Sequence, residues 1–80
     1  MSQEEPNFDR AKFLKRLGKQ IARVRKSRAY SQDRLCLEAG LSRGTMSKIE
    51  AGLADPKAST LYRISATLEV SVKKLMDIET

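Results

Sequence analysis

The sequence predicts an all-α protein, and three observations support that prediction. Apolar residues recur three or four positions apart through most of the chain, which is the period of an amphipathic helix. Ser and Gly residues separate these stretches at positions suited to helix starts and ends. The stretch SQDRLCLEAGLSRGTMSKIEAG, from Ser31 to Gly52, further predicts two short helices joined by a tight turn. That arrangement is typical of a helix-turn-helix.

The chain is expected to begin with a flexible tail. Residues 1–8 are polar and acidic and are interrupted by Pro6, so the folded domain is predicted over residues 9–80. One long helix should run from near Asp9 to about Arg28, because its apolar residues share one face: Phe13, Leu14, Leu17, Ile21 and Val24. This segment is also rich in Lys and Arg, which are most simply interpreted as a solvated outer face.

The central segment predicts the two motif helices. Ser31 is a suitable N-cap for the first, and Gly40 ends it because glycine readily adopts the left-handed backbone of a helix end. Ser42 caps the second helix, and Gly52 ends it. The predicted inward residues are Leu35, Cys36, Ala39, Leu41, Met46 and Ile49. The outer face of the second helix carries small polar and basic residues that suit a nucleic-acid groove: Arg43, Gly44, Thr45, Ser47 and Lys48.

Two more helices are predicted after the motif. Residues 53–57 form a loop, because Pro56 disfavours helix at the residue before it. A helix then runs from about Ala58 to Leu68 and buries Leu61, Ile64, Leu68 and either Ser65 or Ala66. Ser71 caps a last short helix whose apolar residues are Val72, Leu75 and Met76, with Ile78 near the end of the chain.

Composition narrows the class of function. The 80 residues allow one domain with a small core, so dimerisation is a reasonable expectation. Lys and Arg number 16 against 10 Asp and Glu, which gives a net charge of +6 and favours polyanionic partners. The chain has no apolar run of about 20 residues and no signal-peptide pattern, so we expect a cytoplasmic protein without membrane contact.

The sequence offers little for catalysis or metal binding. There is no His, and the single cysteine, Cys36, makes neither a zinc site nor an internal disulfide. Without a catalytic constellation or a glycine-rich phosphate loop, we expect neither an enzyme nor a cofactor. Cys36 is interpreted as a core residue, with a redox-sensing thiol as the alternative.

Four blocks of the chain resemble the lambdoid-repressor and Cro-like helix-turn-helix proteins, the XRE family. They are GKQIARVR from Gly18, SQDRL from Ser31, AGLSRGTMSKIEAG from Ala39 and LEVSVKKLM from Leu68. They occur in the family's order and spacing across about Leu17 to Met76. The resemblance implies a compact five-helix bundle that binds operator DNA, often as a dimer.

The resemblance also implies roles for individual residues. Arg43, Gly44, Thr45, Ser47 and Lys48 match the positions that read bases in the major groove. Gln32, Ser42 and Lys57 are the expected phosphate contacts. Arg25 and Glu50 match a charged pair between the first and third helices, for which we favour a structural role.

The chain departs from the family pattern near the first turn. Ala29 stands where the family usually has glycine, which suggests that the turn before Tyr30 is built differently. Tyr30 occupies an aliphatic core position, with its hydroxyl expected to reach the surface. Cys36 replaces a usual alanine of similar size.

The main hypothesis is a sequence-specific DNA-binding regulator without catalysis. A homodimer would place two recognition helices about 34 Å apart on a pseudo-palindromic duplex site. The predicted dimer interface is the last helix, at Val72, Leu75, Met76 and Ile78. A phage-type repressor and a restriction-modification controller both fit, and without a sensor domain no small-molecule effector is expected.

Two alternatives come from other functional classes. An antitoxin-like protein would bind a partner protein through the N-terminal tail or the last helix and repress its own operon. A helical interaction module would bind duplex DNA weakly and without regard to sequence.

Overall fold

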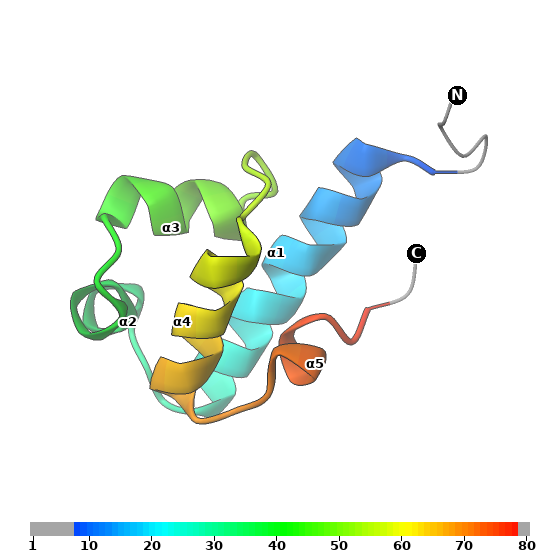
Figure 1. The fold of residues 1–80 in the computed structure, drawn as a ribbon. Helices are drawn as coiled ribbons and strands as arrows, with labels where there is room; N and C mark the ends of the chain where they lie inside the picture. Colours follow the sequence, from blue (N-terminus) through cyan, green and yellow to red (C-terminus); the bar gives the residue numbers. More distant parts are fainter. Residues whose placement is uncertain (1–7, 79–80) are drawn as a thin grey trace.

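The computed structural model describes residues 8–78, and over this range it contains five helices and no strand. Figure 1 shows α2 and α3 at one side of the molecule and α5 at the other, with α1 and α4 running between them. The all-α prediction is confirmed, and so is the order of elements. Their bounds are α1 Arg10–Ser27, α2 Gln32–Ala39, α3 Arg43–Glu50, α4 Ala58–Leu68 and α5 Val72–Leu75.

The predicted N-terminal tail falls almost entirely outside the described residues. Phe8 is the first residue that the structure describes, and its exposed ring lies 6.0 Å from the ring of Phe13, centroid to centroid. Asp9 then caps α1 by accepting a hydrogen bond from the backbone N–H of Lys12 at 3.1 Å. The first helix therefore begins next to Asp9, where the sequence predicts it.

Serine side chains start three of the other helices. Ser31, Ser42 and Ser71 each accept a hydrogen bond of 3.0 Å from the backbone N–H three residues further on. Each hydroxyl satisfies one of the N–H groups that a helix start leaves without a partner. Gly40 and Gly52 follow α2 and α3 with φ of 72° and 77°, in the left-handed region that glycine tolerates. The predicted starts and stops of the motif helices are confirmed.

The turn after α1 differs from the expectation. Ala29 has φ of 61°, which is the left-handed conformation that a glycine at this position would adopt. The turn is therefore not rebuilt, because Tyr30 must still donate its backbone N–H to Arg25 O at 3.1 Å. Instead the alanine is held in a conformation that costs a residue with a Cβ about 1–2 kcal/mol.

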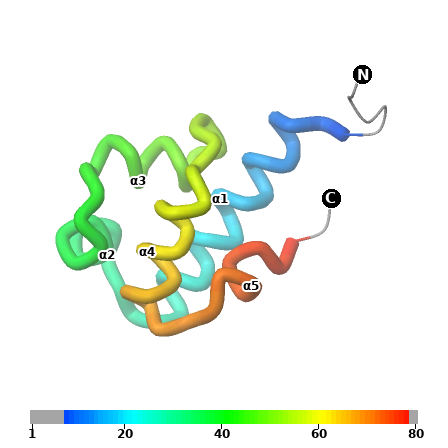
Figure 2. Tube along the Cα trace, viewed as in Figure 1, coloured from blue at the N-terminus to red at the C-terminus, as the bar shows by residue number. Residues whose placement is uncertain are grey.

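The core lies where the inward faces of the helices meet. Figure 2 shows the path that the chain takes through the five helices. Of the two candidates in α4, Ser65 is buried and Ala66 is exposed. The Ser65 hydroxyl donates to Tyr62 O at 2.8 Å, so its burial leaves no unsatisfied donor. The buried apolar residues are Leu14, Leu17, Ile21, Val24, Leu35, Cys36, Ala39, Met46, Ile49, Leu61, Ile64, Leu68 and Leu75.

One predicted interface residue belongs to this core. Leu75 has no exposed surface, so its assignment to a dimer interface is wrong. The reason is the size of the domain: α5 has only four residues, and Leu75 closes the core where α5 packs on α1 and α4. Val72 and Ile78 are half-buried against the same core, whereas Met76 keeps 38% of its surface exposed.

No helix among residues 8–78 combines the length and the apolarity that a membrane crossing requires.

Candidate nucleic-acid interface

Helix α3 presents its polar face to solvent. Met46 and Ile49 anchor the helix in the core with exposed fractions of 0% and 2%. Around Gly44 the surface is open, because a Cβ built there would meet nothing within 4 Å apart from its chain neighbours and the backbone of its own helix. The predicted base-reading residues all lie on this exposed face: Arg43, Gly44, Thr45, Ser47 and Lys48.

A glycine in α1 sets the position of α3. A Cβ on Gly18 would lie 2.5 Å from Ile49 O and 2.6 Å from Glu50 O, so α1 and the end of α3 approach closely at this point. The sequence pattern alone did not predict this role of Gly18. Its signal was a glycine in the middle of an otherwise regular helical pattern, which is costly unless close packing requires it.

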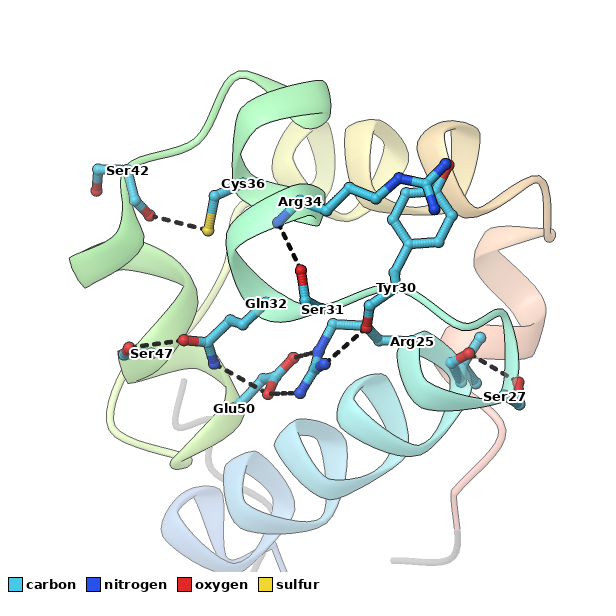
Figure 3. A network of polar contacts seen from close by, with 11 residues as sticks. Arg25, Ser27, Tyr30, Ser31, Gln32, Arg34, Cys36, Ser42, Ser47 and Glu50 are labelled. Atoms are coloured by element: carbon cyan, nitrogen blue, oxygen red, sulfur yellow. Dashed lines mark hydrogen bonds and ion pairs between the residues drawn. The ribbon is translucent and has the colours of Figure 1, made fainter.

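An ion pair also connects the C-terminal end of α3 to α1. Arg25 Nε donates to Glu50 Oε2 at 2.7 Å and Arg25 Nη2 to Glu50 Oε1 at 3.0 Å, while Nη1 donates to Tyr30 O at 2.9 Å (Figure 3). Each side chain is only 10% exposed. Hydrogen bonding to Glu50 raises the pKa of Arg25 above its ordinary value. The family resemblance implied this pair, and the structure contains it.

A chain of hydrogen bonds continues from this pair to the surface of α3. Gln32 Nε2 donates to Glu50 Oε1 at 3.1 Å, and Ser47 Oγ donates to Gln32 Oε1 at 3.1 Å (Figure 3). Gln32, an expected phosphate contact, is thus fixed between two α3 residues. The network sets the orientation of α2 relative to α3 and of Ser47 on the exposed face.

Arg43, the first residue of α3, also has a partner in α2. Its Nε lies 3.0 Å from Asp33 Oδ1, with side chains 75% and 67% exposed. The sequence did not predict this role of Asp33, because its only local signal is an acid in the first turn of α2. An ion pair this exposed is weak, so Arg43 remains available to a stronger partner.

The structure brings Ser42, Thr45 and Lys57 together at one hollow of about 410 Å³ between α3 and the start of α4. Ser42 Oγ donates to Thr45 Oγ1 at 2.7 Å. Asp55, on the same hollow, is held by Arg10 Nη2 at 3.1 Å. The loop that carries Lys57 is therefore placed beside the start of α3.

Other groups near the motif have structural roles. Cys36 is buried, its Sγ donates to Ser42 O at 3.7 Å, and burial raises the pKa of its thiol. The hydroxyl of Tyr30 reaches the surface, as the sequence led us to expect, and there it donates to Glu38 Oε1 at 3.0 Å. Within residues 8–78, no cluster of His, Cys, Asp or Glu side chains is suited to hold a metal ion.

The family model described as Helix-turn-helix, HTH_3, matches residues 21–75. The chain belongs to this XRE-type helix-turn-helix family. That membership confirms the resemblance drawn from the four sequence blocks.

Similar proteins of the helix-turn-helix family include named regulators. The HTH-type transcriptional regulator SlrR of Bacillus subtilis (strain 168) is 42% identical over 65 residues, which are 80% of this chain and 43% of SlrR. The crystal structure of the master regulator for biofilm formation SinR in complex with DNA is 37% identical, with a TM-score of 0.72 over 76% of this chain and 98% of that one.

A more distant structure shares the fold alone. The restriction-modification controller protein C.AhdI from Aeromonas hydrophila is 22% identical, with a TM-score of 0.74 over 81% of this chain and 97% of that one. The present chain spans about half the length of the curated relatives SlrR and SinR.

Proposed function

We propose that this protein is a sequence-specific DNA-binding transcriptional regulator that performs no catalysis. The observation that supports this most strongly is the exposed polar face of α3, held rigidly by Gly18 and by the buried Arg25–Glu50 pair. A face of this kind fits the major groove, which admits one α-helix. The named regulators among its relatives, and the SinR structure in complex with DNA, support the same function. The named relatives are bacterial regulators, and because bacterial DNA lies in the cytoplasm we propose that this protein acts there.

The residues on the exposed face of α3 have different proposed roles in base recognition. Arg43 stands at the start of the helix and is 75% exposed, so its guanidinium reaches out to hydrogen-bond guanine N7 and O6. The missing side chain of Gly44 lets the helix backbone come close to the bases. Thr45, Ser47 and Lys48 complete the face.

Phosphate contacts flank this face on both sides. Ser42 and Lys57 border one hollow next to the start of α3, and Lys57 supplies a positive charge for the backbone of one strand. Gln32 lies on the α2 side, held by Glu50 and Ser47. Contacts on both sides of the recognition helix would fix its register in the groove.

The protein acts as a homodimer on a pseudo-palindromic site in this proposal. Two recognition helices would then enter successive major grooves about 34 Å apart. The exposed side chain of Met76 is the centre of the proposed interface, since Leu75 is buried within the monomer. No small-molecule effector is part of the proposal.

The decisive experiment selects bound sequences from a random duplex pool at about 0.15 M salt and then titrates the winner against scrambled DNA. We expect enrichment of an inverted repeat with half-sites one helical turn apart. Binding that is equally weak for every sequence would contradict the proposal. It would favour a function in binding a partner protein.

A further inference from the structure

A line of basic residues runs along the outside of α1. We call Lys12, Arg16, Lys19, Arg23 and Lys26 the outer stripe. Their spacing of four, three, four and three residues keeps them on one side of the helix. At about 1.5 Å per residue the outer stripe is about 21 Å long. Arg16 is half-buried, and the other four are exposed.

The outer stripe faces away from the proposed interface with DNA. Leu14, Leu17 and Ile21 lie on the opposite, buried side of α1. That buried side also meets α3, through Gly18 and the Arg25–Glu50 pair. A duplex bound at α3 therefore leaves the outer stripe uncovered. In Figure 2, α3 and α5 meet α1 from different sides.

The charge of the outer stripe is not neutralised by its own helix. Arg10–Ser27 contains no Asp or Glu. Arg10 pairs with Asp55 and Arg25 pairs with Glu50, and neither of these two α1 residues belongs to the stripe. The stripe is thus a continuous run of positive charge on a helix without acids.

One stripe residue is held in place by a buried amide. Gln20 is 4% exposed, and its Nε2 donates to Lys74 O in α5 at 2.8 Å. Its Oε1 accepts a hydrogen bond from Arg23 Nη2. The packing of α5 on α1 therefore positions Arg23 at the surface.

Two neighbouring hollows extend this basic surface toward α5. The larger, of about 660 Å³, is lined by Arg16, Lys19, Gln20, Arg23, Asp77 and Ile78. The smaller, of about 220 Å³, is lined by Ser71, Lys73, Lys74 and Asp77. Among these lining residues of the described chain, Asp77 alone is acidic, and it is outnumbered by five cations.

We propose that the outer stripe binds the phosphate backbone of a second DNA duplex while α3 holds the first, so that the protein bridges two DNA segments. A duplex presents about one negative charge per 1.7 Å of its axis, which matches a continuous row of cations. An acidic protein partner fits less well. Docked peptides usually need apolar anchors, and the stripe has none.

The test uses an immobilised duplex that carries the selected site. Protein is bound and washed, and a fluorescent duplex of unrelated sequence is then added. Retention of protein reports the proposed function, and capture of the second duplex reports the bridge. We expect Lys12→Gln, Lys19→Gln and Arg23→Gln together to lower capture about tenfold, with retention changed less than about twofold. Arg16 stays unchanged because it is half-buried.

Matched variants separate charge from structure. Lys12→Arg, Lys19→Arg and Arg23→Lys together keep the charge and should leave capture within about twofold. Asp77→Asn removes the acid between the two hollows and should raise capture.

Four outcomes would overturn the bridge. They are no capture by the unmodified protein, equal capture by the neutralised variant, loss of capture in the charge-keeping variant, and capture of a fluorescent polyglutamate peptide in place of duplex. If protein is not retained on the first duplex, the proposed function fails. The stripe is then judged by direct titration, in which neutralisation should lower the salt slope of duplex binding by about 2.7. Equal slopes would contradict it.

Discussion

Arg43 and Lys57 both border the proposed interface with DNA, but the contacts we propose for them differ in kind. Arg43 begins the helix that enters the groove, whereas Lys57 stands on the loop before α4. Replacing Arg43 by Ala should relax preference at one base pair at a cost of about 1–3 kcal/mol. Lys57→Ala should weaken binding to all sequences alike and reduce the salt slope by about 1. Competition titrations with single-base variants of the selected site measure both effects. Unchanged base preference in Arg43→Ala would refute the assigned recognition face.

Ala29 has a backbone conformation that is unfavourable for a residue with a Cβ atom. Because its φ of 61° suits glycine, Ala29→Gly should stabilise the protein by about 0.5–1 kcal/mol, despite the added freedom of the unfolded chain. Urea unfolding measures the change. The control is Ala66→Gly in the exposed, regular part of α4, which should destabilise by about 1 kcal/mol. Destabilisation by both substitutions would show that Ala29 is not strained.

Removing one partner of the Arg25–Glu50 pair should destabilise the protein much more than replacing both partners. Arg25→Ala leaves the nearly buried Glu50 carboxylate without its main partner and should cost about 3–5 kcal/mol. Combining Arg25→Met with Glu50→Leu should recover part of that loss, but not all, because Tyr30 O and Gln32 also lose a partner. Arg10→Ala, in an exposed pair, is the control and should change stability by less than about 1 kcal/mol. Chemical denaturation of each variant tests this, and a small effect of Arg25→Ala would contradict it.

At the scale of elements, two glycines that both lie inside helices have opposite roles. Gly18→Ala should destabilise the protein clearly, because the new Cβ would meet the backbone of α3 at 2.5 Å and force α1 and α3 apart. Gly44→Ala should stabilise it by about 1 kcal/mol, since its surroundings are open and alanine favours helix.

The two substitutions Gly18→Ala and Gly44→Ala also separate effects on stability from effects on DNA binding. Gly44→Ala should also weaken binding to the selected site, because the methyl group would lie between the helix backbone and the bases. Thermal unfolding and site titration of both variants provide the comparison. A Gly44→Ala protein that is more stable and binds the selected site equally well would contradict the proposed close approach of the helix backbone to the bases.

The elements themselves were largely predictable. The serine caps at Ser31, Ser42 and Ser71 and the glycine stops at Gly40 and Gly52 depend on interactions within a few residues, so local sequence identifies them. The contact of Gly18 with α3 joins residues far apart in the chain. Its local pattern alone did not indicate which helix would pack there.

At the scale of the whole molecule, burial of Cys36 links thiol chemistry to folding. Burial is the main cause of the raised pKa of this thiol, and the nearby charge of Asp33 adds to it. Because the folded-state pKa lies above the unfolded one, the thiol contributes its full stability below the unfolded pKa. It loses that contribution as pH rises through the folded-state pKa.

Labelling of Cys36 should therefore require the molecule to open. We expect a thiol reagent at pH 8 to react slowly with the native protein and faster as urea lowers the free energy of unfolding. The control combines Cys36→Ala with Leu37→Cys, which moves the thiol to a neighbouring position that is 82% exposed and should react at once. Equally fast labelling of both proteins would favour a reactive, sensing thiol at Cys36.

The sequence by itself determined the all-α class, the order of the helices, their caps and the polar face of α3. These depend on hydrophobic period and on short-range hydrogen bonds, which a local pattern records. Tertiary structure decided the rest: that Leu75 closes the core, that Asp33 pairs with Arg43, and that Gln32 links Glu50 to Ser47. Each of these depends on which surfaces meet when helices distant in sequence pack together. Periodicity shows that a face is apolar, but not whether it packs against the same chain or a second copy.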